Sequence, residues 1–101
     1  MRVFIVTYQL RRFHDSRPVV EALQKVGEWC HYFDSAWLIQ TNWTADDIYN
    51  ELASFFTQEE RLLILEVKPT SMYQGWLPQE AWDWIRQRLG PPVALPYWRR
   101  R

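Results

Sequence analysis

The sequence predicts a single α+β domain with four strands, two helices and one additional helix near the C-terminus. Short runs of β-branched and aromatic residues alternate along the chain with longer segments whose apolar residues recur at helical spacing. Proline and glycine residues separate several of these segments. The length of 101 residues, of which 48% are hydrophobic, suits one modest core and excludes a wholly disordered chain.

The first strand and the first helix are predicted near the N-terminus. Residues 3–6, Val-Phe-Ile-Val, form an apolar run that is typical of a strand buried on both faces. Ser16 and Pro18 suit the cap and the first turn of a helix. Apolar residues then recur at helical spacing until Gly27 ends the helix.

A hairpin and a second helix follow. Residues 29–33 and 36–41 are strand-like, and the Asp-Ser pair between them predicts a tight turn. Thr44 and Asp47 have the spacing of a capping box, so we expect a helix to begin there. The apolar stripe of this helix consists of Ala45, Ile48, Leu52, Phe55 and Phe56.

The last strand and the last helix are separated by a loop. Residues 61–67 contain the Leu-Leu-Ile-Leu run of a fourth strand. Pro78 begins a further helix, and Gly90 ends it. Residues 91–101 are predicted to be an extended tail that contains proline and arginine.

The element order β-α-β-β-α-β-α predicts a ferredoxin-like βαββαβ sandwich, with a four-stranded antiparallel sheet and two helices on one face. We expect one domain over residues 1–90, with its core in residues 1–67 and the additional helix at about 78–89. Because the first strand is apolar on both faces, the second face of the sheet should dock against the terminal helix or a second copy of the chain.

The composition argues against several kinds of site. Cys30 is the one cysteine, which excludes a disulfide framework and favours a reducing cytoplasm. His14 and His31 lie in different predicted elements, and no Cys or His pair has metal-ligand spacing, so we expect no metal and no cofactor. The apolar runs are too short to cross a bilayer, and no signal peptide is apparent.

Two segments together resemble a known family. They are residues 7–10 (TYQL), which end the first strand before a basic loop, and residues 27–39 (GEWCHYFDSAWLI). On these residues the chain resembles the SinR-like small proteins of bacteria and phages. Those proteins are similar to the ferredoxin-fold dimer of the CRISPR adaptation complex and to related toxin–antitoxin ribonucleases. The resemblance implies a homodimer that acts on RNA or DNA, in a defence or toxin–antitoxin context.

Gln9 occupies a position that matters to this family. The nuclease members carry an aspartate just after the tyrosine that closes the first strand, and a pair of these carboxylates across the dimer holds Mg²⁺. The matching residue after Tyr8 is Gln9, which has no charge. We therefore expect a degenerate metal position and a member of the family that binds nucleic acid without metal-dependent cleavage.

The loop after the first strand offers an alternative. His14 and Asp15 are the candidates for acid–base chemistry, and Arg11, Arg12 and Arg17 are the candidates for binding nucleic-acid phosphates. A metal-independent endoribonuclease could use this loop. A solvated surface loop is the simpler interpretation of the same residues.

The tryptophans offer a third hypothesis. The chain has seven of them, and several lie around the last helix and the tail. An outward Trp84 with Trp98 and the terminal arginines would suit a surface that binds a protein partner. A tail that folds back over the core would explain the same residues, and both interpretations stay open at this point.

Overall fold

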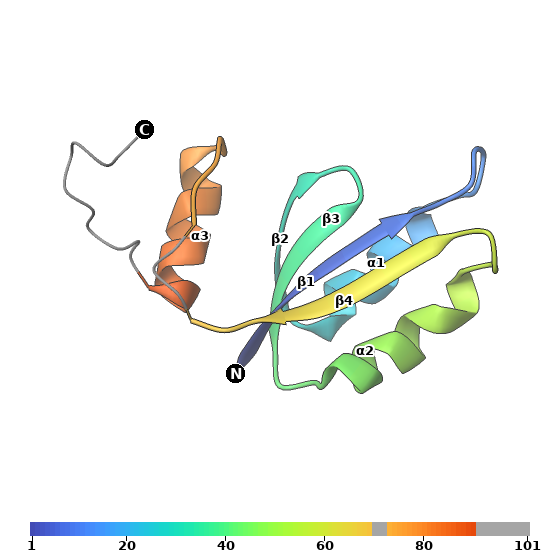
Figure 1. The fold of residues 1–101 in the computed structure, drawn as a ribbon, viewed down its shortest axis with the longest axis horizontal. Coiled ribbons are helices and arrows are strands. Elements are labelled where there is room, and N and C mark those ends of the chain that lie inside the picture. Colours follow the sequence, from blue (N-terminus) through green and yellow to red (C-terminus); the bar gives the residue numbers. More distant parts are fainter. Residues whose placement is uncertain (70–72, 91–101) are drawn as a thin grey trace. The chain divides into compact units, whose positions relative to one another are not determined.

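The computed structural model describes residues 1–69 and 73–90 (Figure 1). The chain divides into two units, residues 1–67 and residues 68–101, and each unit is compact by itself. The predicted C-terminal tail, with Trp98, lies outside the described residues. None of the helices in the described ranges is long and apolar enough to cross a membrane.

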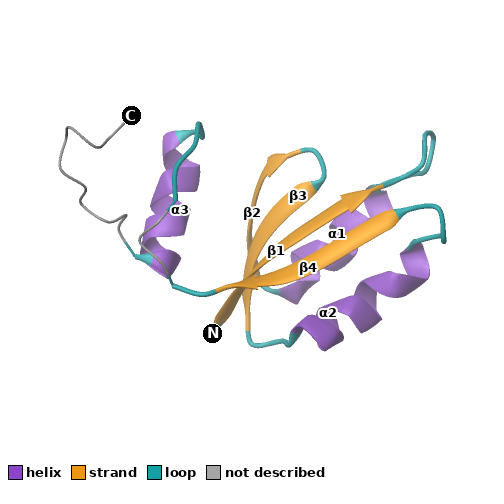
Figure 2. Ribbon diagram, viewed as in Figure 1, coloured by secondary structure: helices purple, strands orange, loops and turns teal. Residues whose placement is uncertain are grey.

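The first unit contains a four-stranded antiparallel sheet (Figure 2). Its strands are β1 (Arg2–Gln9), β2 (Glu28–Phe33), β3 (Ala36–Thr41) and β4 (Arg61–Val67). They are ordered β2-β3-β1-β4, and every neighbouring pair is antiparallel. The central place of β1 explains its apolar run. The predicted α+β fold is confirmed, and a ferredoxin-like arrangement is consistent with this strand order.

Two helices cover one face of this sheet. They are α1 (Arg17–Val26) and α2 (Ala45–Leu52), and a 3-10 turn, η1 (Ala53–Phe55), directly follows α2. Alternate residues of the central strands meet the apolar stripes of both helices, as strand and helix periodicities require. The buried residues of this core are Phe4, Val6, Tyr8, Val19, Ala22, Leu23, Val26, Trp37, Ile39, Ile48 and Leu52.

The two helices begin differently. The predicted capping box of α2 is confirmed, because the Thr44 side chain accepts from the Asp47 N–H and the Asp47 carboxylate accepts from the Thr44 N–H. Ser16 occupies the cap position of α1 but makes no side-chain capping bond. Asp15 supplies an acceptor there instead, since its carboxylate takes the Arg17 N–H at 3.0 Å.

A few close contacts fix how the strands pair. The indole N–H of Trp37 donates to the hydroxyl of Tyr8 at 3.2 Å, so two large buried side chains satisfy each other. Gly27 lies between α1 and β2, where an added Cβ would come within 2.1 Å of the Gln40 carbonyl oxygen. Only glycine allows this approach, which explains why the helix pattern ends there.

The second face of the sheet is also apolar. The strand register places Ile5 opposite Leu38 on one side and Leu65 on the other. Leu63 is paired with Thr7 on the same face. Leu63 and Leu65 are 54% and 55% exposed, which is unusual for two leucines so close together.

The second unit is built around α3 (Gln79–Leu89), close to the helix predicted at 78–89. Tyr73 stacks on Trp82 with ring centroids 5.9 Å apart, and its hydroxyl donates to the Gly90 carbonyl oxygen at 2.8 Å. The Arg88 guanidinium lies 4.1 Å from the ring centre of Trp84. The two contacts of Tyr73 tie both ends of α3 to the segment that precedes it, and the Arg88–Trp84 contact lies within the helix.

Candidate functional site

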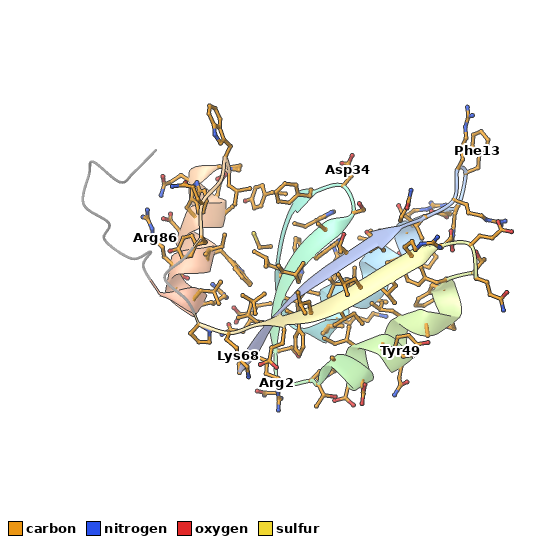
Figure 3. All side chains as sticks on the ribbon, in the orientation of Figure 1. Arg2, Phe13, Asp34, Tyr49, Lys68 and Arg86 are labelled. Atoms are coloured by element: carbon orange, nitrogen blue, oxygen red, sulfur yellow. The ribbon has the colours of Figure 1, made fainter. Side chains whose placement is uncertain are left out.

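The candidate site lies where β1 ends. The chain leaves Gln9 and makes a tight turn in which the His14 N–H donates to the Arg11 carbonyl oxygen at 3.0 Å. Figure 3 shows Phe13 at the far end of this loop, projecting away from the sheet. The turn therefore places three of the residues singled out in the sequence, Arg11, Arg12 and His14, within four consecutive positions.

A buried carboxylate holds the loop. The side chain of Glu60, just before β4, has no solvent exposure. It accepts the backbone N–H of Arg11 at 2.8 Å and that of Thr57 at 2.9 Å. Its third partner is Nδ1 of His14, at 2.5 Å. One carboxylate thus joins the segment before α1 to the segment before β4.

These hydrogen bonds decide the ionisation of Glu60. Burial raises the pKa of its carboxyl, but the bonds from the Arg11 N–H, His14 and the Thr57 N–H outweigh burial and lower the pKa to about 2. An ionised carboxylate only accepts hydrogen bonds, so the proton between the two side chains belongs to Nδ1 of His14. When the imidazole is neutral, its Nε2 then carries the lone pair.

An open pocket of about 550 Å³ lies beside this pair. It is formed by the end of β1, the start of α1 and the turn between β2 and β3, and its lining residues are Tyr8, Gln9, Leu10, His14, Ser16, Asp34 and Ser35. The His14 side chain is one-quarter exposed, and Nε2 has no hydrogen-bond partner among the described residues. The pocket therefore offers one basic nitrogen among hydroxyl, amide and carboxylate groups.

The three arginines singled out in the sequence, two in the loop and Arg17 at the start of α1, differ in their partners. Arg11 forms an ion pair with Glu59 at 3.1 Å, and Arg17 forms one with Asp15 at 2.8 Å. Arg12 has no carboxylate partner within the described ranges, and its guanidinium lies 4.9 Å from the ring centre of Phe13. Arg12 is thus the arginine of this loop most available to an anionic ligand.

Asp15 belongs with Arg17 more than with His14. Hydrogen bonds from the Arg17 side chain and backbone lower the pKa of the Asp15 carboxyl to about 2. Its carboxylate accepts from the Arg17 N–H and guanidinium, whereas His14 is held by Glu60. From the sequence, Asp15 was the predicted partner of His14. In the structure the partner is Glu60, which lies 46 positions away in the chain.

The other predicted residues lie in different places. Gln9 is exposed at the end of β1, opposite Arg61 in the strand register, and lines the pocket. Within residues 1–69 and 73–90, no group of three His, Cys, Asp or Glu residues could hold a metal ion. Trp84 packs against Arg88 in the second unit, and the position of Trp98 is not described.

Glu60 is the site residue that sequence reasoning missed. In the sequence it is one of several acids in the middle of the chain, next to Glu59. A usable signal existed, because the segment before β4 must lie beside the segment after β1 once these two strands pair antiparallel. This signal can be used only when the order of the strands in the sheet is known.

No family model, curated protein or solved structure matches the chain. Because one fold hosts many functions, the function of this chain must be inferred from the pocket and from the residues around it.

Proposed function

We propose that this chain binds RNA at the pocket beside the β1–α1 loop and cleaves it without a metal ion, with His14 as the general base. The observation that supports this most directly is the contact between Nδ1 of His14 and the buried carboxylate of Glu60, which leaves Nε2 as the other ring nitrogen of a pocket-lining residue. A histidine oriented by a carboxylate is a recurrent arrangement for moving protons.

The proposed step is an internal transesterification. Nε2 of His14 takes the proton of a ribose 2′-hydroxyl, and the 2′-oxygen forms a bond to the adjacent phosphorus. The bond from phosphorus to the 5′-oxygen of the next nucleotide breaks, and this oxygen takes a proton from a water molecule. The hydroxide left from that water takes the proton held on Nε2 of His14, which restores the neutral imidazole. The products are a 2′,3′-cyclic phosphate and a 5′-hydroxyl, and no electrons are exchanged with any other group.

Glu60 is a positioning residue in this proposal. It fixes which imidazole nitrogen carries the proton and stabilises the imidazolium after the proton transfer. Arg12 supplies a guanidinium for the phosphate, since Arg11 and Arg17 are already paired with carboxylates. Arg11 contributes in a second way, because its backbone N–H also holds Glu60.

Binding without cleavage is the second candidate. Gln9 favours it, because a neutral amide stands where the family that the chain resembles has its metal-binding aspartate. On this proposal the chain is a cytoplasmic, nucleic-acid-associated protein of a defence or toxin–antitoxin system that has lost its metal site. The β1–α1 loop, with Arg12, would then bind nucleic acid without cleaving it.

In both proposals the chain acts as a homodimer. Exposed leucines at positions 63 and 65, next to Ile5 and Leu38, support docking of a second copy on this sheet face. A protein partner that binds at Trp84, on α3 of the second unit, is the rival proposal.

The test is cleavage of a fluorescent single-stranded RNA in EDTA, with the DNA of the same sequence as a second substrate. We expect the RNA to be cut to a 2′,3′-cyclic phosphate and the DNA to stay intact, since DNA has no 2′-hydroxyl. His14→Gln keeps a donor for Glu60 but removes the base, so it should abolish cleavage. His31→Gln, prepared in parallel, is the matched control, because His31 stacks on Trp37 and is not one of the pocket-lining residues. Equal cleavage by both variants would indicate a contaminating nuclease and reject this function, and binding without any cut would favour the second candidate.

A further inference from the structure

Phe13 stands out as a large apolar side chain in an unfavourable place. It is 91% exposed, and the core of the first unit does not include it. It is also the only residue other than glycine with a positive φ, 69°, among those that the structure describes. At this exposure the ring contributes almost no burial to the fold, and the left-handed backbone conformation of Phe13 is a cost to the folded state.

The turn itself explains what the position prefers. In the four-residue turn from Arg11 to His14, Phe13 is the third residue, where a positive φ is normally supplied by glycine or asparagine. Glycine would adopt this conformation without strain and without exposing a ring. The choice of phenylalanine therefore has no reason within the described fold.

The surroundings of Phe13 hold the turn in place. The Arg11 N–H and the His14 imidazole both bind the buried Glu60 carboxylate, on either side of the ring-bearing residue. The Arg11 side chain is also paired with Glu59. An aromatic ring on a loop tied down in this way is presented to solvent with little conformational freedom left to lose on binding.

Arg12 adds a second recognition element. Its guanidinium lies 4.9 Å from the Phe13 ring centre, in the range of a cation–π contact. The guanidinium covers one face of the ring, and the high exposure of Phe13 leaves the other face open. This pair fits a nucleotide, whose base stacks on an aromatic ring and whose phosphate accepts from a guanidinium. His14, the next residue, lines the pocket.

We infer that Phe13 stacks on an unpaired base of single-stranded RNA while Arg12 binds the adjacent phosphate, which together place the strand next to His14. This inference rests on the proposed function for the identity of the ligand as RNA. It deepens that function by naming the form of the substrate, since a base that is paired in a duplex has no face open for stacking.

The probe is a short fluorescent 2′-O-methyl RNA, which has no 2′-hydroxyl and is not cut, in single-stranded and duplex forms. Phe13→Gly removes the ring and relieves the backbone strain, so the variant should unfold at the same or a higher temperature than the parent chain. We expect its affinity for the single strand to fall about tenfold, the effect of losing one base–aromatic stack. Phe13→Trp should restore the affinity.

The affinities of the Phe13 variants for the single-stranded and duplex probes decide between support and rejection of the inference. Unchanged affinity of Phe13→Gly for the single strand overturns the inference, and so does an equal loss of affinity for single strand and duplex. A selective loss that Phe13→Trp reverses supports it. Because the probe cannot react, a chain that binds it through Phe13 but never cuts RNA would disprove the proposed cleavage and leave the stacking role intact.

Discussion

The imidazole of His14 lies 2.5 Å from the buried carboxylate of Glu60, and 46 positions separate the two residues in the chain. His14 comes from the loop after β1, and Glu60 comes from the turn that leads into β4. The antiparallel pairing of β1 with β4, with Gln9 opposite Arg61, brings these two segments together. The contact is thus a direct product of the strand order.

Replacing Glu60 with glutamine should weaken both the fold and the chemistry. The glutamine amide has a single acceptor oxygen and adds two N–H donors against three groups that already donate, namely the N–H groups of Arg11, Thr57 and His14. We expect the Tm to fall by several degrees. For RNA cleavage, we expect kcat to fall by a larger factor than KM rises. Glu59→Gln is the matched control, because Glu59 is exposed and pairs only with Arg11. Equal Tm values for the two variants would contradict the role assigned to Glu60.

The stability of the chain should depend on acid through Glu60. Hydrogen bonds lower the pKa of this carboxyl to about 2 from its ordinary value of 4.5, so the unfolded chain takes up the proton first as the pH falls. The stabilisation is complete above pH 4.5 and is lost as the pH approaches 2. Thermal unfolding should be measured at pH 7, 4.5 and 2.5. The difference in Tm between the parent chain and Glu60→Gln should become smaller as the pH falls. Asp15→Asn is the comparison, since the Asp15 carboxyl has a similarly lowered pKa at an exposed site. A gap that is constant with pH would refute this assignment.

Arg12 should account for more of the electrostatic binding of RNA than Arg17 does. Arg12 has no carboxylate partner among the described residues, whereas Arg17 is bound by Asp15. Binding of the 2′-O-methyl probe should weaken in Arg12→Ala, and the slope of log K against log salt should become shallower by about 1. Arg17→Ala should change the slope less. A larger change of slope in Arg17→Ala than in Arg12→Ala would assign the phosphate contact to Arg17, at the start of α1.

The sheet face that carries Leu63 and Leu65 should control self-association. A lysine at position 65 places a charge among exposed and half-buried apolar side chains, so the proposed dimer should dissociate. Light scattering should report twice the chain mass for the parent protein and the chain mass for Leu65→Lys. Tyr49→Lys is a suitable control, since Tyr49 is equally exposed, at 55%, but lies on α2. A monomeric parent chain at high concentration would remove the homodimer from both functional proposals.

The elements were predictable because their signals are local. The Asp-Ser turn lies between two strand-like runs, and the Thr44–Asp47 capping box needs only three residues of spacing. Ser16 was harder to interpret, because Asp15 takes the neighbouring N–H and leaves the serine side chain without a capping role. The order of the strands in the sheet followed only from the ferredoxin-like expectation.

The site was predictable only in part, for a physical reason. His14 and the arginines form one cluster in the sequence, and the structure places Arg11, Arg12 and His14 in one loop and Arg17 at the start of α1. Their partners Glu59 and Glu60 are distant in sequence, and the choice of partner depends on which strand ends lie together. The metal position at Gln9 and the resemblance to the SinR-like proteins stay predictions.

The two backbone bonds to Glu60 have a consequence for the motion of the molecule. The amide protons of Arg11 and Thr57 end on the same carboxylate, so neither segment can open to water without exposing the anion that holds the other. Hydrogen exchange at these two amides should therefore be slow and should occur at matching rates, although they belong to separate loops. The loop after β1, which carries the pocket-lining His14, and the segment before β4 should therefore open together and not one at a time.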